Sequence, residues 1–212
     1  MKGVTAKSSE KGAKKRMTGE ERKAQIVRVA TDLFAKKGFK GTTTREIAVK
    51  AGISEAVIFK HFARKEDLYT AIIDSRCSDN LGQPRLMNLL KGKKGKVVFK
   101  EVASYLITEH QRDSSFLRLL TYSALEKHEL SELFIKTKGL ELFGFLESHI
   151  KELMDEGVLK KADPAISAAA FMGMVLHYSI SQEIYGLKRY YKWPNEHVVA
   201  SFVDIFFEGM RR

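Results

Sequence analysis

The residues best placed for recognition chemistry begin a short helical pattern over residues 54–62. Glu55 carries a carboxylate that can accept a hydrogen bond from cytosine N4, and Ala56 and Val57 carry methyl groups that fit a thymine methyl. Ser54 is the expected N-cap that fixes where this helix begins. Since the first turn of a helix in the DNA major groove meets base edges, the chemistry predicted here is base recognition.

Two short helical patterns must pack together to hold that turn in place. Ala48 lies where the helices would cross, and its small side chain permits close approach. Gly52 follows where the chain must turn, and a positive φ is expected there. Ile58 then returns to pack against the first helix, and the surrounding apolar residues are Ile47, Ile53, Val57 and Phe62. This spacing is typical of a helix-turn-helix, whose second helix enters the major groove.

Capping signals mark the starts of the surrounding helices. Thr43 and Glu46 have the spacing of a capping box, in which each side chain accepts from a free backbone N–H of the other residue. Thr18 and Glu21 repeat this pattern before an apolar stripe over residues 21–37. The pattern therefore predicts a compact N-terminal module of four helices.

Several runs in this module resemble the DNA-binding domain of the TetR family, the bacterial one-component regulators named for the tetracycline repressor. The runs are Thr42–Ala48, Ala51–Ser54, Phe59–Phe62 and Lys65–Leu68, within residues 20–75. The resemblance implies an all-helical chain, a homodimer formed by the C-terminal helices, and an effector pocket that differs between members.

The motif positions predict which residues contact double-stranded DNA. Thr43, Thr44 and Arg45 open the first motif helix, where free N–H groups can hold a phosphate. The other expected contacts are Ser54, Glu55, Ala56, Val57, Phe59, Lys60, His61 and Lys65. Family members commonly have tyrosine in place of Phe59, which can pack or touch a sugar but cannot donate to a phosphate. Arg64 replaces a usual capping serine, and both a phosphate contact and a free surface arginine are open for it.

Charge is spread unevenly along the chain, whose formal net charge is +11. Residues 1–78 carry 18 Lys and Arg against 9 Asp and Glu, whereas residues 79–212 carry 19 against 17. A basic head on a near-neutral body indicates a polyanionic partner that is met through one end.

The first 17 residues are basic and rich in Gly and Ser, so a disordered arm over residues 1–17 is expected. Lys14, Lys15 and Arg16 can lie along the minor groove or the phosphates, with a solvated tail as the alternative. The segment lacks the apolar core of a secretory signal. The single cysteine, Cys77, excludes an intrachain disulfide and fits a reducing cytoplasm.

The remainder of the chain predicts a larger all-α domain over residues 79–212, after a DNA-binding domain over residues 18–78. Asp79–Pro84 is a turn-rich break, and residues 91–96 are an expected loop. Helices are expected at about residues 96–111, 113–127, 129–156, 164–188 and 195–210, which gives about nine helices in all. The longest apolar run, Ala168–Leu176, is too short to span a membrane.

The last two helical patterns are apolar on nearly every side. The first carries small residues beside larger apolar ones: Ala165, Ala168, Ala169, Ala170, Gly173, Phe171, Met172, Met174, Val175 and Leu176. The second carries Val198, Val199, Phe202, Val203, Ile205, Phe206 and Phe207. Such helices require cover all round, and a two-fold interface with another copy supplies it better than one core. A homodimer also gives two readout helices the half-site spacing of a palindromic operator.

The middle helices carry aromatic and flexible apolar residues that could line a pocket for a small, mainly apolar or aromatic effector. Its expected apolar lining is Phe116, Leu120, Tyr122, Phe134, Phe145, Phe171, Met174 and Tyr178, with Leu133, Phe143 and Tyr185 nearby. The expected polar anchors are His110, His177 and Gln182. Aromatic residues at helical spacing also form ordinary cores, so a solid body is the alternative.

Three functions are compared on this basis. The main hypothesis is a repressor that a small molecule releases from its operator. A DNA-binding regulator without such an effector, either an activator or a protein-responsive one, remains open. An enzyme is not expected: Glu132 stands where a zinc motif beginning at His128 needs a second histidine, and no phosphate loop or paired-cysteine spacing occurs. Neither a metal nor a cofactor is expected.

Overall fold

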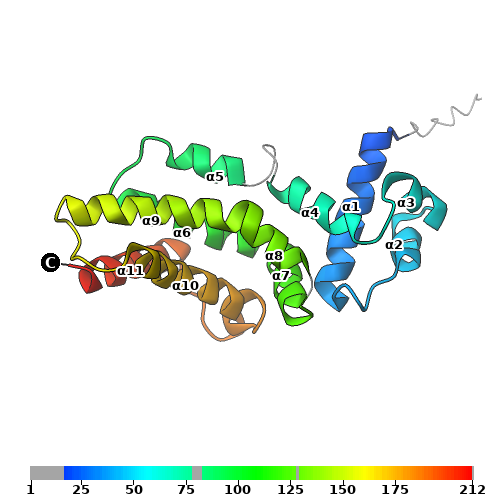
Figure 1. Ribbon diagram of the computed structural model, residues 1–212. Coiled ribbons are helices and arrows are strands. Elements are labelled where there is room, and N and C mark those ends of the chain that lie inside the picture. Colours follow the sequence, from blue (N-terminus) through cyan, green and yellow to red (C-terminus); the bar gives the residue numbers. More distant parts are fainter. Residues whose placement is uncertain (1–16, 78–82, 128, 212) are drawn as a thin grey trace, which may run out of the picture.

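A computed structural model describes residues 17–77, 83–127 and 129–211, and within these ranges every regular element is a helix (Figure 1). The all-α fold class is therefore confirmed. The basic arm before Met17, the side chain of Cys77 and the predicted boundary at residues 78–79 lie outside the described residues.

The head consists of four helices, as the sequence predicts: α1 Gly19–Lys37, α2 Thr44–Ala51, α3 Glu55–His61 and α4 Asp67–Cys77. α1 begins with the expected capping box, in which the Glu21 N–H donates to Thr18 Oγ1 at 3.2 Å and the Thr18 N–H donates to Glu21 Oε2 at 2.7 Å. The core of the head is formed by apolar residues from all four helices, among them Ile26, Phe34, Ile47, Ile58, Leu68 and Ile72.

The body contains the remaining elements. They are α5 Gln83–Leu90, α6 Lys96–Arg112, α7 Ser115–Leu125, α8 Glu129–Phe134, a π-helical turn η1 at Ile135–Gly139, α9 Leu140–Asp155, α10 Pro164–Glu183, a 3-10 turn η2 at Leu187–Arg189, and α11 Asn195–Gly209. Figure 1 shows α6, α9, α10 and α11 lying lengthwise along the body with their axes roughly aligned, and the head at one end of this bundle.

Three details of the body differ from the sequence expectations. α5 forms where the Pro84 signal indicated a break, because a proline in the first turn of a helix costs no backbone hydrogen bond and Leu86 and Leu90 are buried in the core. The helix expected over residues 129–156 is interrupted by η1. α10 ends at Glu183, since the chain takes a left-handed turn at Gly186.

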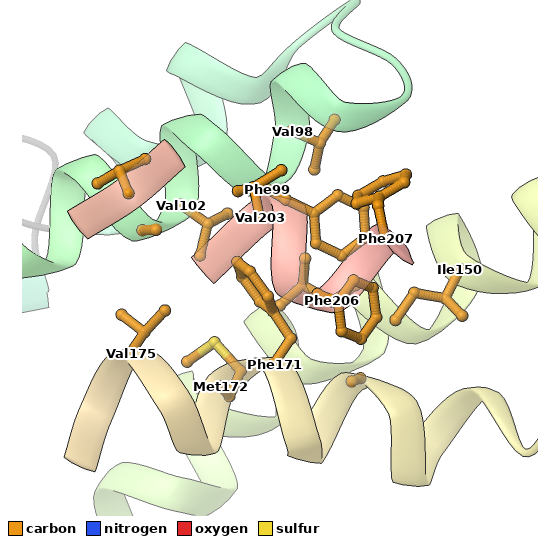
Figure 2. Packing of buried hydrophobic residues seen from close by; sticks show 14 of the residues in the cluster. Val98, Phe99, Val102, Ile150, Phe171, Met172, Val175, Val203, Phe206 and Phe207 are labelled. Atoms are coloured by element: carbon orange, nitrogen blue, oxygen red, sulfur yellow. The ribbon is translucent and has the colours of Figure 1, made fainter. Parts of the chain in front are cut away.

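The body core is built around Phe99 of α6. Its ring centroid lies 4.9 Å from that of Phe171, 5.3 Å from Phe206 and 5.1 Å from Phe207, which joins α6, α10 and α11 (Figure 2). Rings packed edge-to-face and stacked in this way fix the helices relative to one another.

α10 is long enough and, at a mean hydropathy of 1.2, apolar enough to cross a membrane by length and composition alone. Core helices pass the same test, and Ala168, Phe171 and Val175 of α10 are buried in the body core. The composition of α10 is therefore weak evidence for a membrane.

Head and body share one apolar boundary. Leu119 of α7 is fully buried within the core of the head, and Leu130 of α8 is 1% exposed there. Phe116, Leu133 and Phe134 pack against the same cluster. A shift of α7 or α8 is consequently felt by the helices of the head.

Candidate DNA-binding site

The turn between α2 and α3 has the geometry that the spacing predicts. Gly52 adopts φ 67° and ψ 36°, in the left-handed region. The Ile53 N–H donates to the Ala48 carbonyl oxygen at 3.0 Å, which closes the end of α2. Ala48 and Ile58 are buried at the crossing, with exposed fractions of 3% and 1%. The two helices therefore form a braced helix-turn-helix.

The start of α2 is fixed by a reciprocal cap. The Glu46 N–H donates to Thr43 Oγ1 at 3.1 Å, and the Thr43 N–H donates to Glu46 Oε2 at 3.0 Å. Lys37 Nζ lies 2.6 Å from Glu46 Oε1, and this hydrogen bond, more than the cap itself, lowers the pKa of Glu46. The predicted capping box is confirmed.

The first turn of α3 is open to a partner. Ser54 and Ala56 are exposed, while Glu55 and Val57 are half-buried. Ser54 has the extended backbone of an N-cap, but its side chain makes no capping hydrogen bond. Its position as N-cap is confirmed, whereas its hydroxyl does not hold the helix start.

The remaining expected DNA contacts are distributed around the same face. Arg45 and Lys60 are exposed, Phe59 is 49% exposed, and His61 is half-buried. Exposure of a phenylalanine ring to this extent fits the expected packing or sugar contact.

Two basic residues follow α3, and Lys65 differs from the expectation whereas Arg64 does not. Lys65 Nζ donates to the carbonyl oxygens of Phe39 and Thr42, both at 2.7 Å, so its ammonium turns inward and the predicted phosphate contact is not supported. Burial lowers the pKa of Lys65. Arg64 remains largely exposed, and Asp67 Oδ2 accepts from its backbone N–H at 2.9 Å. The Asp67 side chain thus supplies one half of a capping box, whereas a serine at position 64 would supply the other half by accepting from the Asp67 N–H.

The residues predicted to line an effector pocket do not share one environment. Phe171 is fully buried and belongs to the packed aromatic centre, so its assignment as a pocket residue is corrected. Tyr122 and His177 are exposed on the outside of the body. Phe116 and Phe134 contact each other at 5.3 Å between ring centroids and pack on the core of the head. Leu120, Phe145, Met174 and Tyr178 are half-buried.

Two of the predicted polar anchors carry a buried atom without a hydrogen-bond partner. Nδ1 of His110 and Nε2 of Gln182 are buried without a hydrogen-bond partner. Burial lowers the pKa of His110 to about 4, so its ring is neutral at pH 7. Ser179 Oγ and His149 Nε2 are buried and unpartnered in the same way, and sequence spacing gave no signal for either. α6, which carries His110, is followed directly by α7, and Arg118 of α7 donates to the carbonyl oxygen of Glu183 at the end of α10, which carries Gln182.

The head also carries a surface hollow along α1. Its volume is about 490 Å³, and its lining is Met17, Glu21, Ala24, Gln25 and Arg28. Because these residues follow one helix and the hollow is open, it offers little enclosure for a ligand. Among the described residues no group of three or more His, Cys, Asp and Glu side chains is arranged to hold a metal ion.

Comparison with known proteins agrees with this geometry. Residues 26–72 match the family model of the bacterial regulatory proteins of the tetR family, and residues 101–209 match that of the AefR-like transcriptional repressor C-terminal domain. The uncharacterized HTH-type transcriptional regulator YvkB of Bacillus subtilis is 29% identical over 194 residues, which is 88% of this chain and 95% of that protein. HbdR, an HTH-type transcriptional regulator of Aromatoleum, is 25% identical over 88% of this chain and 74% of its own length.

Solved structures share the fold. AibR, determined with isovaleryl coenzyme A and operator DNA, has a TM-score of 0.72 at 22% identity and covers 88% of this chain and 98% of its own. The fatty acid degradation regulator FadR of Bacillus halodurans has a TM-score of 0.72 at 15% identity, over 93% and 100%. Since the two family models together span the helix-turn-helix and the body, the chain belongs to the TetR family of DNA-binding transcriptional regulators, which are not enzymes.

Proposed function

We propose that this protein is a cytoplasmic, homodimeric repressor that a small, mainly apolar effector releases from a palindromic operator. The observation that carries the proposal is the open first turn of α3 on a head whose core includes Leu119 and Leu130 of the body. A head that shares its core with the body can respond to what the body binds.

The dimer is supported by the outer faces of α10 and α11. Ile166 is 70% exposed and Ile205 is 62% exposed, and burial of these large apolar side chains against a second copy would be favourable. Ala169, Ala170 and Gly173 are exposed on α10, and such small side chains permit close approach of a second helix. A two-fold axis through this face would present two copies of α3 to one side of the duplex.

The effector chemistry follows from the buried polar groups of the body. The Gln182 amide nitrogen needs an acceptor, and the neutral imidazole of His110 can accept or donate through Nδ1. The half-buried Phe145 and Met174 offer apolar surface. An effector with an apolar chain and a carbonyl or similar acceptor fits this set. AibR, which shares the fold, was solved with isovaleryl coenzyme A, so acyl thioesters and fatty acids are the first compounds to test.

The experiment has two steps. Sequences bound by the full chain are first selected from a random DNA pool, and an inverted repeat is expected. Acyl thioesters and fatty acids of increasing chain length are then titrated against the complex, and one class should weaken operator affinity by tenfold or more, as the coupling free energy of allosteric proteins allows. Recovery of a single half-site would contradict the dimer. Tight operator binding that none of these compounds changes would contradict the proposed effector class.

A further inference from the structure

The loop between α1 and α2, residues 38–43, is held from both the body and the head. On the body side Glu126, which ends α7, accepts a hydrogen bond from the Phe39 N–H through Oε2 at 3.2 Å. On the head side Lys65 donates to the carbonyl oxygens of Phe39 and Thr42. One peptide segment thus lies between an acidic group of the body and a basic group of the head.

The residues that make these hydrogen bonds lie in a largely buried environment with charged neighbours. Phe39 is 8% exposed and Thr42 is fully buried. The Lys65 ammonium lies 3.8 Å from the centroid of the Phe39 ring. Burial lowers the pKa of Lys65, and the charges of Glu66 and then Glu126 oppose that lowering. Burial also raises the pKa of Tyr69, and the charge of Glu126 raises it further. Charge-assisted hydrogen bonds in such partly buried sites are stronger than neutral ones.

The loop leaves little room for a different placement of Glu126. Gly38 adopts φ 71°, and a Cβ atom built there would lie 2.5 Å from Glu126 Oε1. The absence of a side chain at Gly38 therefore provides the space that the carboxylate fills. Thr42 Oγ1 donates to the Gly38 carbonyl oxygen at 3.0 Å, and Thr43, the next residue, is the N-cap of α2. Movement of this loop is passed directly to the start of α2.

The apolar contacts across the same boundary have less directional character. Leu119 and Leu130 fill the core of the head, and their packing transmits a shift of α7 or α8 without depending on the angle of any one contact. A hydrogen bond is lost over a few tenths of an ångström and depends on angle. The polar contact is consequently the better sensor of where α7 lies.

We propose that Glu126 is a positioning residue that couples the body to the helix-turn-helix through the α1–α2 loop. When α7 moves, the carboxylate leaves the Phe39 N–H, and the loop that leads into α2 loses this contact with the body. The inference rests on the proposed function only for the identity of the ligand that moves α7. Coupling between two sites is reciprocal, so operator DNA bound at the head must also affect α7.

The test uses the full chain and backbone amide hydrogen exchange. In the free protein Glu126→Ala should raise the exchange rate of the Phe39 amide at least tenfold, because its acceptor is removed. Glu126→Gln retains an acceptor without the charge and should give an intermediate rate. Glu147→Ala, at an exposed position on α9, is the matched control and should leave that rate unchanged.

Addition of the selected operator duplex provides the second readout. In the wild type, DNA should slow exchange at the end of α7 as well as in α2 and α3. In Glu126→Ala the protection of α2 and α3 should remain, and that of α7 should be lost. Equal protection of α7 in both proteins, or an unchanged Phe39 rate in the free variant, would overturn the coupling role. Wild type that binds no duplex would instead contradict the proposed repressor, and the Phe39 rate would still decide the role of Glu126.

Discussion

Thr44 on α2 and Glu55 on α3 are joined by a hydrogen bond of 2.5 Å from Thr44 Oγ1 to Glu55 Oε1. The motif positions assign Thr44 to a phosphate and Glu55 to a base edge, as separate contacts. In the structure the hydroxyl of the first holds the carboxylate of the second. Because a base-reading group that is already oriented loses less entropy on binding, this bond favours discrimination by Glu55.

Thr44→Val tests that relationship. It removes the donor at nearly constant side-chain volume, so Glu55 should become mobile and lose about 1 to 2 kcal/mol of discrimination at the base pair it reads. Dissociation constants for operators with single base changes would measure the loss. A uniform weakening across all these operators would show instead that Thr44 acts as a phosphate contact.

Lys60→Ala addresses the backbone contacts of α3. Lys60 is exposed near the end of the helix, and loss of one phosphate contact should reduce the slope of log affinity against log salt by about 0.9. Binding to all sequences should weaken alike. The same salt titration on Lys65→Ala should show no comparable change in slope, since that ammonium is bound to carbonyl oxygens. If Lys65→Ala instead reduces the slope of log affinity against log salt by about 0.9, Lys65 contacts a phosphate as the motif positions predict.

Gly52→Ala isolates the backbone requirement of the turn. No atom lies within 4 Å of a Cβ built at Gly52, so the cost comes from its positive φ alone, about 1 to 2 kcal/mol. For a chain of this size, each kcal/mol lowers the melting temperature by about 2 to 4 °C. Gly144→Ala, at an uncrowded position inside α9, is the matched control and should raise the melting temperature instead. Similar shifts in both variants would show that φ at Gly52 is not the cause.

Ile205→Glu tests the dimer face. The side chain is 62% exposed in one protomer, so the substitution should leave the fold intact but place two charges against each other across the two-fold axis. Analytical ultracentrifugation should detect monomer, and affinity for the palindromic operator should fall by at least two orders of magnitude. Val158→Glu, at a residue 49% exposed at the far end of the body, should remain dimeric. A dimeric Ile205→Glu protein would place the interface elsewhere.

His110 predicts a pH dependence of stability. Its folded pKa is about 4 against the usual 6.5, because burial disfavours the charged ring, so the unfolded state binds the extra proton. The contribution of His110 to the free energy of unfolding is fully present above pH 6.5 and is lost as the pH falls from 6.5 toward 4. The total loss is on the order of 3 kcal/mol. Urea unfolding of wild type and of His110→Gln at pH 7 and pH 5 would measure it. Identical losses in the two proteins between those pH values would exclude His110 as the cause.

The head could be predicted almost completely from local patterns. Capping boxes at Thr18 and Thr43, the small Ala48 and the left-handed Gly52 are set by residues within a few positions, and each is present in the structure. The side-chain direction of Lys65 could not be predicted in this way. Its partners, Phe39 and Thr42, lie more than twenty positions earlier and meet it only in the folded chain.

The body shows the limit of reasoning from composition. Phe171 and Phe145 have the same residue type at similar helical positions, yet one is fully buried against Phe99 and the other is half-buried. Which aromatic residue fills the core depends on how the helices cross, and a single sequence does not report that. Glu126 was likewise indistinguishable from other surface acids until α7 was placed beside the α1–α2 loop.

Selection of the operator by the first turn of α3, once in each half of a two-fold complex, is the expectation on which the proposed function rests. It is tested most directly by selecting DNA with the wild type and with a Glu55→Ala, Val57→Ala double variant, followed by sequencing. Both selections should recover inverted repeats, and the bases should change at symmetric positions of the two halves. An identical consensus from both proteins, or sites without two-fold symmetry, would contradict it.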